Sequence, residues 1–107
     1  TKRVTRKIKL SYNYKIWLEH DKKPLLGKGR YELLKYINKT NSLKLSAKKV
    51  GISNKTAYNY IKKMENNLGK KVIDSHKGGK DAGGYTKLNS TGIELIEKYE
   101  EALSSIN

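Results

Sequence analysis

Hydrophobic and polar positions alternate along residues 8–18. The even positions hold Ile, Leu or Tyr, whereas the odd positions hold polar residues with the exception of Trp17. This period of two predicts a half-buried strand over residues 8–18, followed by a hairpin turn over residues 20–23 and a short return strand over residues 24–26. On the polar face of such a strand, Trp17 either packs under a loop or lies in a subunit interface.

The spacing of apolar residues becomes helical after the return strand. Gly27 and Gly29 indicate a loop. The apolar positions between Tyr31 and Ile37 then recur at helical intervals, which predicts a helix that ends near Lys39.

Residues 42–69 predict two further helices joined by a tight turn. Ser42 can cap the first and Ser53 the second, because a serine oxygen accepts a backbone N–H that the first turn of a helix leaves unpaired. Gly51 suits a left-handed position between the helices, and Gly69 is a typical helix end. The buried stripe of the first helix is predicted to hold Leu43, Ala47 and Val50, and that of the second Ala57, Ile61, Met64 and Leu68.

The rest of the chain predicts a β-hairpin and a final helix. Residues 72–73 and 85–88 are short strands joined by the glycine-rich stretch 77–84. The final helix begins near Asn89, or at a capping-box pair of Thr91 and Glu94. Its apolar stripe suits either a coiled-coil seam between two subunits or packing on its own domain. That stripe, the predicted dimer interface, holds Ile96, Tyr99, Leu103 and Ile106.

Together these elements predict an α+β fold that is mainly α: a winged helix-turn-helix with an N-terminal β-hairpin and a C-terminal dimerisation helix. A chain of 107 residues is one domain by its length. We expect a basic tail and the hairpin over residues 1–26, the helix-turn-helix and its wing over 27–88, and the C-terminal helix over 89–107.

The charge of the chain narrows the choice of partner. The formal net charge is +14, and residues 1–87 carry 23 Lys and Arg against 6 Asp and Glu, whereas residues 88–107 carry one Lys against 4 Glu. A basic body with an acidic C-terminal segment favours a polyanionic partner over a merely solvated surface. Because no basic amphipathic helix carries a matching large apolar face, we expect no membrane contact.

The second helix of a helix-turn-helix enters the DNA major groove. Residues 54–68 carry Asn, Tyr and Lys opposite the buried stripe, where Asn can pair with adenine, Tyr can contact a thymine methyl group or a phosphate, and Lys can neutralise phosphates. The N-termini of both helices offer backbone N–H groups to phosphates. The predicted DNA-binding residues are Ser42, Lys44, Lys48, Ser53, Asn54, Lys55, Thr56, Tyr58, Asn59, Lys62 and Lys63. The alternative is a solvated helical face.

The glycine-rich stretch 77–84 is predicted to form the tip of the wing. Its glycines allow close approach to the sugar-phosphate backbone, and Lys77, Gly79 and Lys80 are candidate contacts to that backbone or the minor groove. A flexible loop is the alternative. The stretch is not a Walker phosphate loop, because Asp81 follows Lys80 where a Ser or Thr would bind magnesium.

No catalytic or metal-binding constellation emerges from the sequence. The chain has no cysteine, and its two histidines, His20 and His76, lie far apart. We therefore expect a protein that is not an enzyme and needs no metal or cofactor. No apolar run approaches the ~18 residues of a membrane span, and we expect a cytoplasmic, nucleoid-associated location.

The order of these motifs resembles a known family. The segments GKGRYELLKYI, SLKLSAKKVGIS and KTAYNYIKKMENNLGKKVI, followed by GGKDAGG, Leu88 and Gly92, resemble the N-terminal domain of the molybdate-responsive regulator ModE and, more distantly, the winged helix of LysR-type regulators. The resemblance implies a dimer whose recognition helix, here residues 54–68, contacts a palindromic operator. Asn54 and Tyr58 depart from the family's usual residues, and so no operator sequence is transferred. The molybdate-binding domains are missing from this sequence, and we expect no molybdate binding.

These patterns favour a homodimeric winged-helix protein that binds double-stranded DNA as a transcriptional regulator. The alternative is a sequence-tolerant chromatin protein that coats or bridges DNA. A third class, a protein-interaction module or an RNA binder, would use tyrosine-rich surfaces. Specificity separates the first two, since a regulator retains a preference of ~10³ or more for its site at physiological salt.

Overall fold

The computed structural model describes residues 17–76 and 85–105. The predicted strand over residues 8–18 lies outside the described residues except for its last two positions. The predicted wing tip, with Lys77, Gly79 and Lys80, and the predicted interface residue Ile106 also lie outside them. The described elements are β1 (Leu18–His20), β2 (Lys23–Leu26), α1 (Lys28–Thr40), α2 (Leu43–Val50), α3 (Asn54–Leu68), β3 (Ile73–His76), β4 (Tyr85–Leu88) and α4 (Ser90–Ser104).

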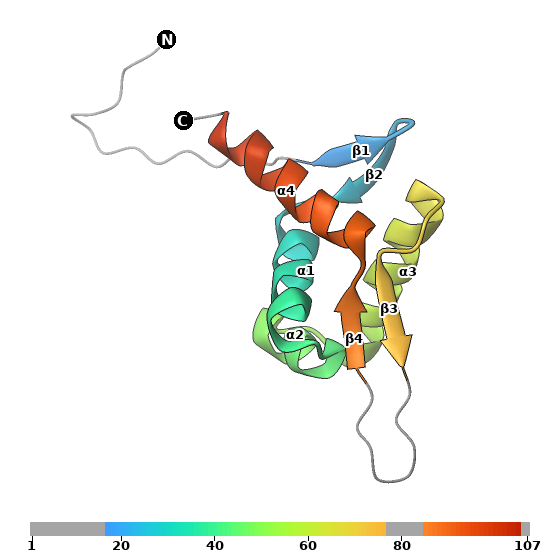
Figure 1. Cartoon of the computed structure of the whole chain (residues 1–107), viewed down its shortest axis with the longest axis vertical. Helices are drawn as coiled ribbons and strands as arrows, with labels where there is room; N and C mark the ends of the chain where they lie inside the picture. Colours follow the sequence, from blue (N-terminus) through green and yellow to red (C-terminus); the bar gives the residue numbers. More distant parts are fainter. Residues whose placement is uncertain (1–16, 77–84, 106–107) are drawn as a thin grey trace, which may run out of the picture.

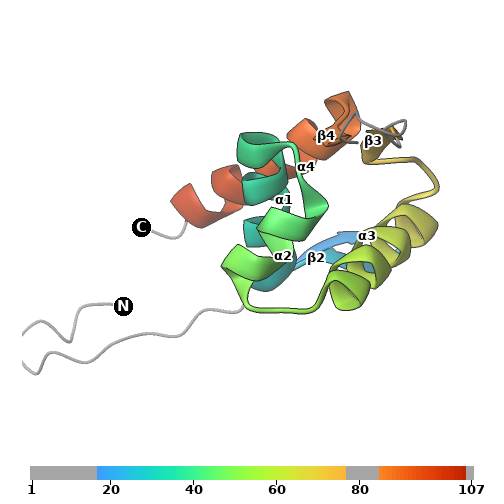
Figure 2. The same ribbon diagram turned by 90° about the horizontal axis from the view of Figure 1, so that it is seen from below.

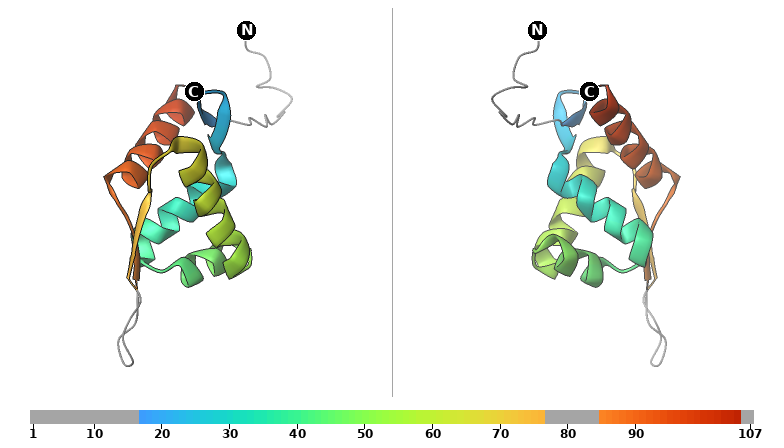
Figure 3. Two further views of the ribbon diagram at one scale, coloured as in Figure 1. Left: turned by 90° about the vertical axis from the view of Figure 1, so that its right-hand side faces the viewer. Right: turned by 90° about the vertical axis from the view of Figure 1, so that its left-hand side faces the viewer.

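The helices are arranged around α1 (Figure 1). α1 contacts both α2 and α4, and α3 contacts α2 and β2. Seen from below, α1 lies between α4 and the layer formed by α2 and α3 (Figure 2). The antiparallel hairpin of β3 and β4 stands at one edge of these helices (Figure 3). This arrangement confirms the predicted α+β, mainly helical winged helix-turn-helix.

The hairpin of β1 and β2 is present, but its turn is shorter than predicted. His20 pairs with Lys23, which leaves only Asp21 and Lys22 in the turn. Both turn residues have positive φ, 50° and 67°, because a two-residue hairpin loop must follow the right-handed twist of its strands. The hairpin is attached to the end of α3, since the side-chain amide of Asn67 donates to the carbonyl of Pro24 at 2.8 Å.

The predicted loop over Gly27 and Gly29 is wrong at Gly29. α1 begins at Lys28, and the Gly27 carbonyl accepts the first helical hydrogen bond from the Tyr31 N–H at 2.9 Å. A glycine in the first turn of a helix costs only about 1 kcal/mol relative to alanine, which the packing of α1 outweighs. The Trp17 ring lies against Gly27, where a β-carbon would come within 2.8 Å of it.

The two predicted helices of residues 42–69 are confirmed together with their ends. The Ser42 hydroxyl accepts from the backbone N–H of Leu45, and the Ser53 hydroxyl accepts from that of Thr56, each at 3.0 Å. Gly51 and Gly69 adopt φ values of 85° and 79°, at which a side chain would be strained. α2 and α3 are therefore bounded by their own local sequence.

The core lies between α1, α3, α4, β2 and the hairpin of β3 and β4. Its fully buried large hydrophobic members are Leu26, Leu33, Leu34, Ile37, Ile61, Met64 and Val72. Ala57 and Ala47 are also buried where α3 and α2 pack on their neighbours. Small side chains at these two positions let the helices approach closely, which fixes the angle at which α3 presents its outer face.

The junction between the wing and α4 fixes both elements to the core. The Asn89 side chain caps α4 by accepting from the Gly92 N–H at 3.0 Å, which selects Asn89 over the alternative pair of Thr91 and Glu94. The Asn89 N–H also donates to the Val72 carbonyl at 3.0 Å. In addition, the Thr86 N–H donates to the Asn41 carbonyl at 3.0 Å, which joins β4 to the connection between α1 and α2.

Two members of the predicted α4 stripe belong to the core of their own chain. Ile96 is 8% exposed and Tyr99 is 2% exposed. The Tyr99 ring stacks on Tyr31 with centroids 4.5 Å apart, and the Tyr31 hydroxyl donates to Glu100 at 2.7 Å. Packing on its own domain, one of the two alternatives left open for this stripe, therefore accounts for Ile96 and Tyr99. Leu103 remains exposed.

Candidate nucleic-acid interface

The outer face of α3 is a continuous polar surface. Ala57, Ile61 and Met64 point into the core, and this burial turns the opposite side of the helix to solvent. The exposed residues on α3 are Asn54, Lys55, Tyr58, Asn59, Lys62, Lys63 and Asn66. Asn and Lys side chains of this kind can donate hydrogen bonds to base edges and phosphate oxygens.

The single carboxylate of α3 is turned away from this face. The Glu65 side chain is 10% exposed and accepts from the backbone N–H of Val72 at 2.9 Å. Its other oxygen lies 3.7 Å from the Lys62 ammonium. Lys62 therefore has part of its charge compensated, whereas no described carboxylate lies within 4.0 Å of the ammonium of Lys55 or Lys63.

Tyr58 stands at the centre of the outer face. Its side chain is 49% exposed, and the Lys62 ammonium lies 5.4 Å from the centroid of its ring. A lysine over an aromatic face gains about 0.5–1 kcal/mol at an exposed site, which is enough to bias the rotamers of both side chains. Tyr58 and Lys62 consequently present one aromatic and one cationic group side by side.

α2 adds two exposed lysines, Lys44 and Lys48, one helical turn apart. The hydroxyls of Ser42 and Ser53 are engaged in capping, and Thr56 shares in the second cap because its hydroxyl oxygen accepts from Ser53 at 2.9 Å. These three residues hold the helix ends, where backbone N–H groups give a partial positive charge. One end of the molecule contains α2, the start of α3 and the lower ends of β3 and β4 (Figures 1 and 3).

The structure adds exposed residues that the sequence patterns did not single out. Leu45 on α2 is 52% exposed, since it falls outside the buried stripe of that helix. On β4, Tyr85 is 42% exposed and the Lys87 ammonium lies 5.1 Å from its ring centroid. The alternation of Tyr85 and Lys87 with inward Leu88 could have indicated this outer face of the wing strand.

Trp17 is 48% exposed and lies beside α1 rather than on the outer face of α3. The Arg30 guanidinium lies near two aromatic rings, 5.8 Å from the centroid of Trp17 and 5.0 Å from that of Tyr60. Arg30 also donates to the Leu25 carbonyl at 3.3 Å. This cluster ties the start of the described chain to α1 and α3.

A metal site and a membrane-spanning helix are two other features that residues 17–76 and 85–105 could contain. No group of three or more His, Cys, Asp or Glu side chains there is placed to hold a metal ion. None of the helices in these ranges is long and apolar enough to cross a membrane.

Comparison with known proteins identifies the class of domain. No family model matches the chain. The crystal structure of Vibrio fischeri DarR in complex with DNA, a LysR-type (LTTR) protein, is similar with a TM-score of 0.54 and 14% identity, over 74% of this chain and 25% of that one. The chain therefore shares the winged helix-turn-helix fold of that protein.

The chain is also homologous to the molybdenum-pterin-binding protein MopB of Rhodobacter capsulatus. The two are 38% identical over 74 residues, which cover 69% of this chain and 27% of MopB. The resemblance to the N-terminal region of ModE, which the motifs predicted, is thus confirmed. The chain spans about a quarter of the length of MopB and of DarR.

Proposed function

We propose that this chain is the double-stranded-DNA-binding domain of a transcriptional regulator, with α3 in the major groove. The observation that carries the proposal is the outer face of α3, which holds three exposed lysines while its one carboxylate is turned inward. The homology to a segment of MopB and the likeness in fold to DNA-bound DarR support the same class of function.

Base recognition is assigned to the first half of α3, since the N-terminal residues of a recognition helix contact base edges. The amides of Asn54 and Asn59 each match the donor and acceptor that adenine presents in the major groove, and Tyr58 can contact a thymine methyl group. A well-formed bidentate pair contributes about 1–3 kcal/mol of discrimination against the wrong base.

Phosphate contacts are assigned to the lysines around that helix. Lys55, Lys62 and Lys63 come from α3, and Lys44 and Lys48 from α2. The helix ends held by Ser42, Ser53 and Thr56 attract phosphates through their backbone N–H groups. The wing contacts predicted from sequence at Lys77, Gly79 and Lys80 complete the proposed interface.

We further propose a homodimer that matches a palindromic DNA site, because a two-fold protein fits a two-fold sequence. The exposed side of α4 supports this proposal: Ile93 is 38% and Leu103 is 37% exposed. Ile96 and Tyr99 would contribute by holding α4 on the core, and Ile106 and Trp17 are the other residues that the sequence predicts for this interface.

Two single substitutions test the proposed interface by fluorescence anisotropy with labelled duplexes. Lys55→Ala is expected to weaken binding to every duplex and to lower the magnitude of the salt slope, d log K/d log [salt], by about 0.9. Asn59→Ala is expected to lose about 1–3 kcal/mol of preference between sites that differ at one base pair.

The chain offers a matched control for each variant. Lys23→Ala removes an exposed lysine from β2, at the far end of the molecule, and Asn66→Ala removes an exposed Asn from the last turn of α3. Neither control is expected to change affinity or preference by more than about twofold. If Lys55→Ala and Asn59→Ala bind as their controls do, α3 is not in the DNA interface and the proposal is wrong.

A sequence-tolerant chromatin protein is the second candidate, favoured by the net charge of +14 and by exposed lysines outside the α3 face. Competition with unrelated duplex DNA at physiological salt separates the two. A regulator keeps a preference of about 10³ or more for its site, whereas a chromatin protein binds all duplexes with similar affinity.

A further inference from the structure

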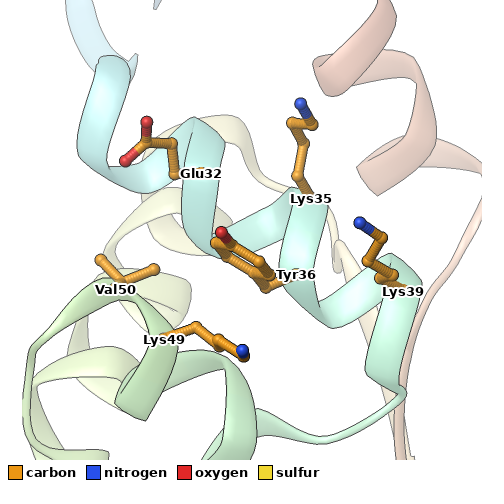
Figure 4. A pocket seen from close by; sticks show the side chains of 6 residues that line it. All are labelled: Glu32, Lys35, Tyr36, Lys39, Lys49 and Val50. Atoms are coloured by element: carbon orange, nitrogen blue, oxygen red, sulfur yellow. The ribbon is translucent and has the colours of Figure 1, made fainter.

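A basic pocket lies between α1 and α2, outside the interface proposed above. It has a volume of about 240 Å³ and is lined by Glu32, Lys35, Tyr36, Lys39, Lys49 and Val50. Figure 4 shows the ring of Tyr36 between Lys49, which comes from α2, and the two lysines of α1. Lys39 and Lys49 therefore flank one aromatic ring, and Lys35 and Glu32 extend from α1 beside it.

The lysines of this pocket are available for an external partner. No described carboxylate lies within 4.0 Å of the ammonium of Lys35, Lys39 or Lys49. The Lys35 ammonium lies 5.3 Å from the centroid of the Tyr31 ring, which orients it without neutralising it. All three lysines are exposed, whereas Tyr36 and Val50 are partly buried and form the floor.

The pocket opens on a different side of the domain from the outer face of α3. On α2, Lys49 is turned by about 100° from Lys48, because successive residues of an α-helix differ by that angle. Lys35 and Lys39 lie on α1, which in Figure 2 lies between α2 and α4, whereas α3 lies to the right of α2. A duplex held by α3 and the Lys44–Lys48 side of α2 therefore leaves the pocket uncovered.

We propose that this pocket binds the phosphate backbone of a second DNA duplex, so that one domain joins two duplexes. The inference rests on the proposed function, because the first duplex is held by α3. Lys35 and Lys39 are one helical turn apart, about 6 Å along the axis, and Lys49 supplies a third charge from across the pocket. The Tyr36 hydroxyl lies at the end of the ring that faces Glu32 (Figure 4).

Duplex DNA fits this pocket better than a small anion. The charged groups are lysines, which act as mobile point charges and form no rigid fork around a single phosphate. An exposed charge pair is weak because water screens it, and one ion would gain little from three of them. A duplex carries one charge per ~1.7 Å of its axis and engages several lysines at once.

Glu32 limits the strength of this second contact. Its carboxylate lines the same pocket and repels phosphate. The second duplex is consequently bound more weakly than the first and is released first as the salt concentration rises. Glu32→Gln removes the repulsion without changing the shape of the side chain, and this substitution is expected to strengthen the second contact only.

A bridging assay tests the proposal. One duplex is fixed to beads, the protein is added, and retention of a second, dye-labelled duplex of unrelated sequence is measured. Lys39→Ala/Lys49→Ala is expected to lower retention at least about fivefold, and Glu32→Gln to raise it about twofold, while affinity for a single duplex in solution changes less than about twofold. The matched control, Lys23→Ala/Lys70→Ala, removes the same charge at the opposite end of the domain.

The outcomes separate this inference from the proposed function. If the wild-type protein binds no single duplex, the proposed function itself fails. If it binds one duplex and the pocket variant bridges as well as the control does, two copies of α3 in a dimer hold the two duplexes and the inference about the pocket is wrong. It is also wrong if the pocket lysines alter binding of inorganic phosphate, followed by ³¹P NMR, but leave bridging at the wild-type level.

Discussion

A methyl group added at position 92 is expected to disrupt the junction between the wing and α4. Gly92 is buried in the first turn of α4, and a β-carbon there would overlap the carbonyl oxygen of Val72. It would also lie 3.1 Å from Cδ2 and 3.2 Å from Cβ of Leu88. The Val72 carbonyl cannot simply withdraw, because it accepts the Asn89 N–H at 3.0 Å.

The size of the effect follows from one stabilising and two destabilising contributions to the free energy of unfolding. Ala is favoured over Gly in a helix by about 0.8–1.0 kcal/mol. Overpacking at a buried site costs about 1–3 kcal/mol, and weakening of the hydrogen bond to Val72 costs a further ~0.5–1.5 kcal/mol. For Gly92→Ala we therefore expect the free energy of unfolding to fall by about 2 kcal/mol, and the Tm of a domain of this size to fall by about 8–16 °C.

Thermal unfolding followed by circular dichroism measures this effect. Gly29→Ala is the matched control, because Gly29 lies in the first turn of α1 with no atom within 4 Å of its added β-carbon. The control is expected to keep the wild-type free energy of unfolding or to raise it by up to about 1 kcal/mol. A Gly92→Ala protein that melts at or above the wild-type temperature would refute the reasoning about the Val72 carbonyl.

Further predictions concern the α1–α4 contact, the cap of α3 and the dimer. Burial, reinforced by the hydrogen bond to Glu100, raises the pKa of Tyr31 to about 12, and burial also raises the pKa of Tyr99. In the unfolded chain the hydroxyl of Tyr31 has its ordinary pKa of 10.0. The stability that neutral Tyr31 contributes is therefore present below pH 10 and is lost as the pH rises toward 12. Tyr31→Phe should flatten this decline, as measured by urea unfolding at several pH values, and a decline equal to that of the wild type would contradict the assignment. Ser53→Ala should lower the free energy of unfolding by about 1 kcal/mol in the same assay, whereas Ser104→Ala, at an exposed helix end, should leave it unchanged. Leu103→Glu should convert a dimer to a monomer in sedimentation equilibrium, and a variant that stays dimeric would exclude the exposed side of α4 as the contact.

The helix-turn-helix could be predicted from sequence because its signals are local. Ser42 and Ser53 cap the helices that follow them, and Gly51 and Gly69 adopt the left-handed conformation that ends α2 and α3. Each of these signals acts within a few residues. The spacing of Ala57, Ile61 and Met64 then defines which side of α3 is buried, and so the outer face follows from the sequence as well.

Features that depend on distant contacts could not be predicted. The inward turn of Glu65 depends on the backbone N–H of Val72, seven residues later, and the first turn of α1 tolerates Gly29 because of tertiary packing. The apolar stripe of α4 has the same spacing whether it contacts a second subunit or its own core. Only the position of α4 beside Tyr31 shows that Tyr99 packs internally.

The pocket between α1 and α2 likewise could not be predicted from the sequence. Lys49 is distant from Lys35 and Lys39 along the chain, and each lysine alone is typical of a solvated helix. Folding brings them to one pocket because α2 packs on α1, with Ala47 and Ser46 buried.

The central claim, that α3 enters DNA, is tested most directly by ¹⁵N–¹H NMR of the labelled protein during titration with a short duplex, up to one equivalent. The account predicts the largest amide shifts at residues 54–63 and at the start of α2, with little change in the hairpin of β1 and β2. Shifts concentrated in α4 or in β1 and β2, with α3 unchanged, would contradict it.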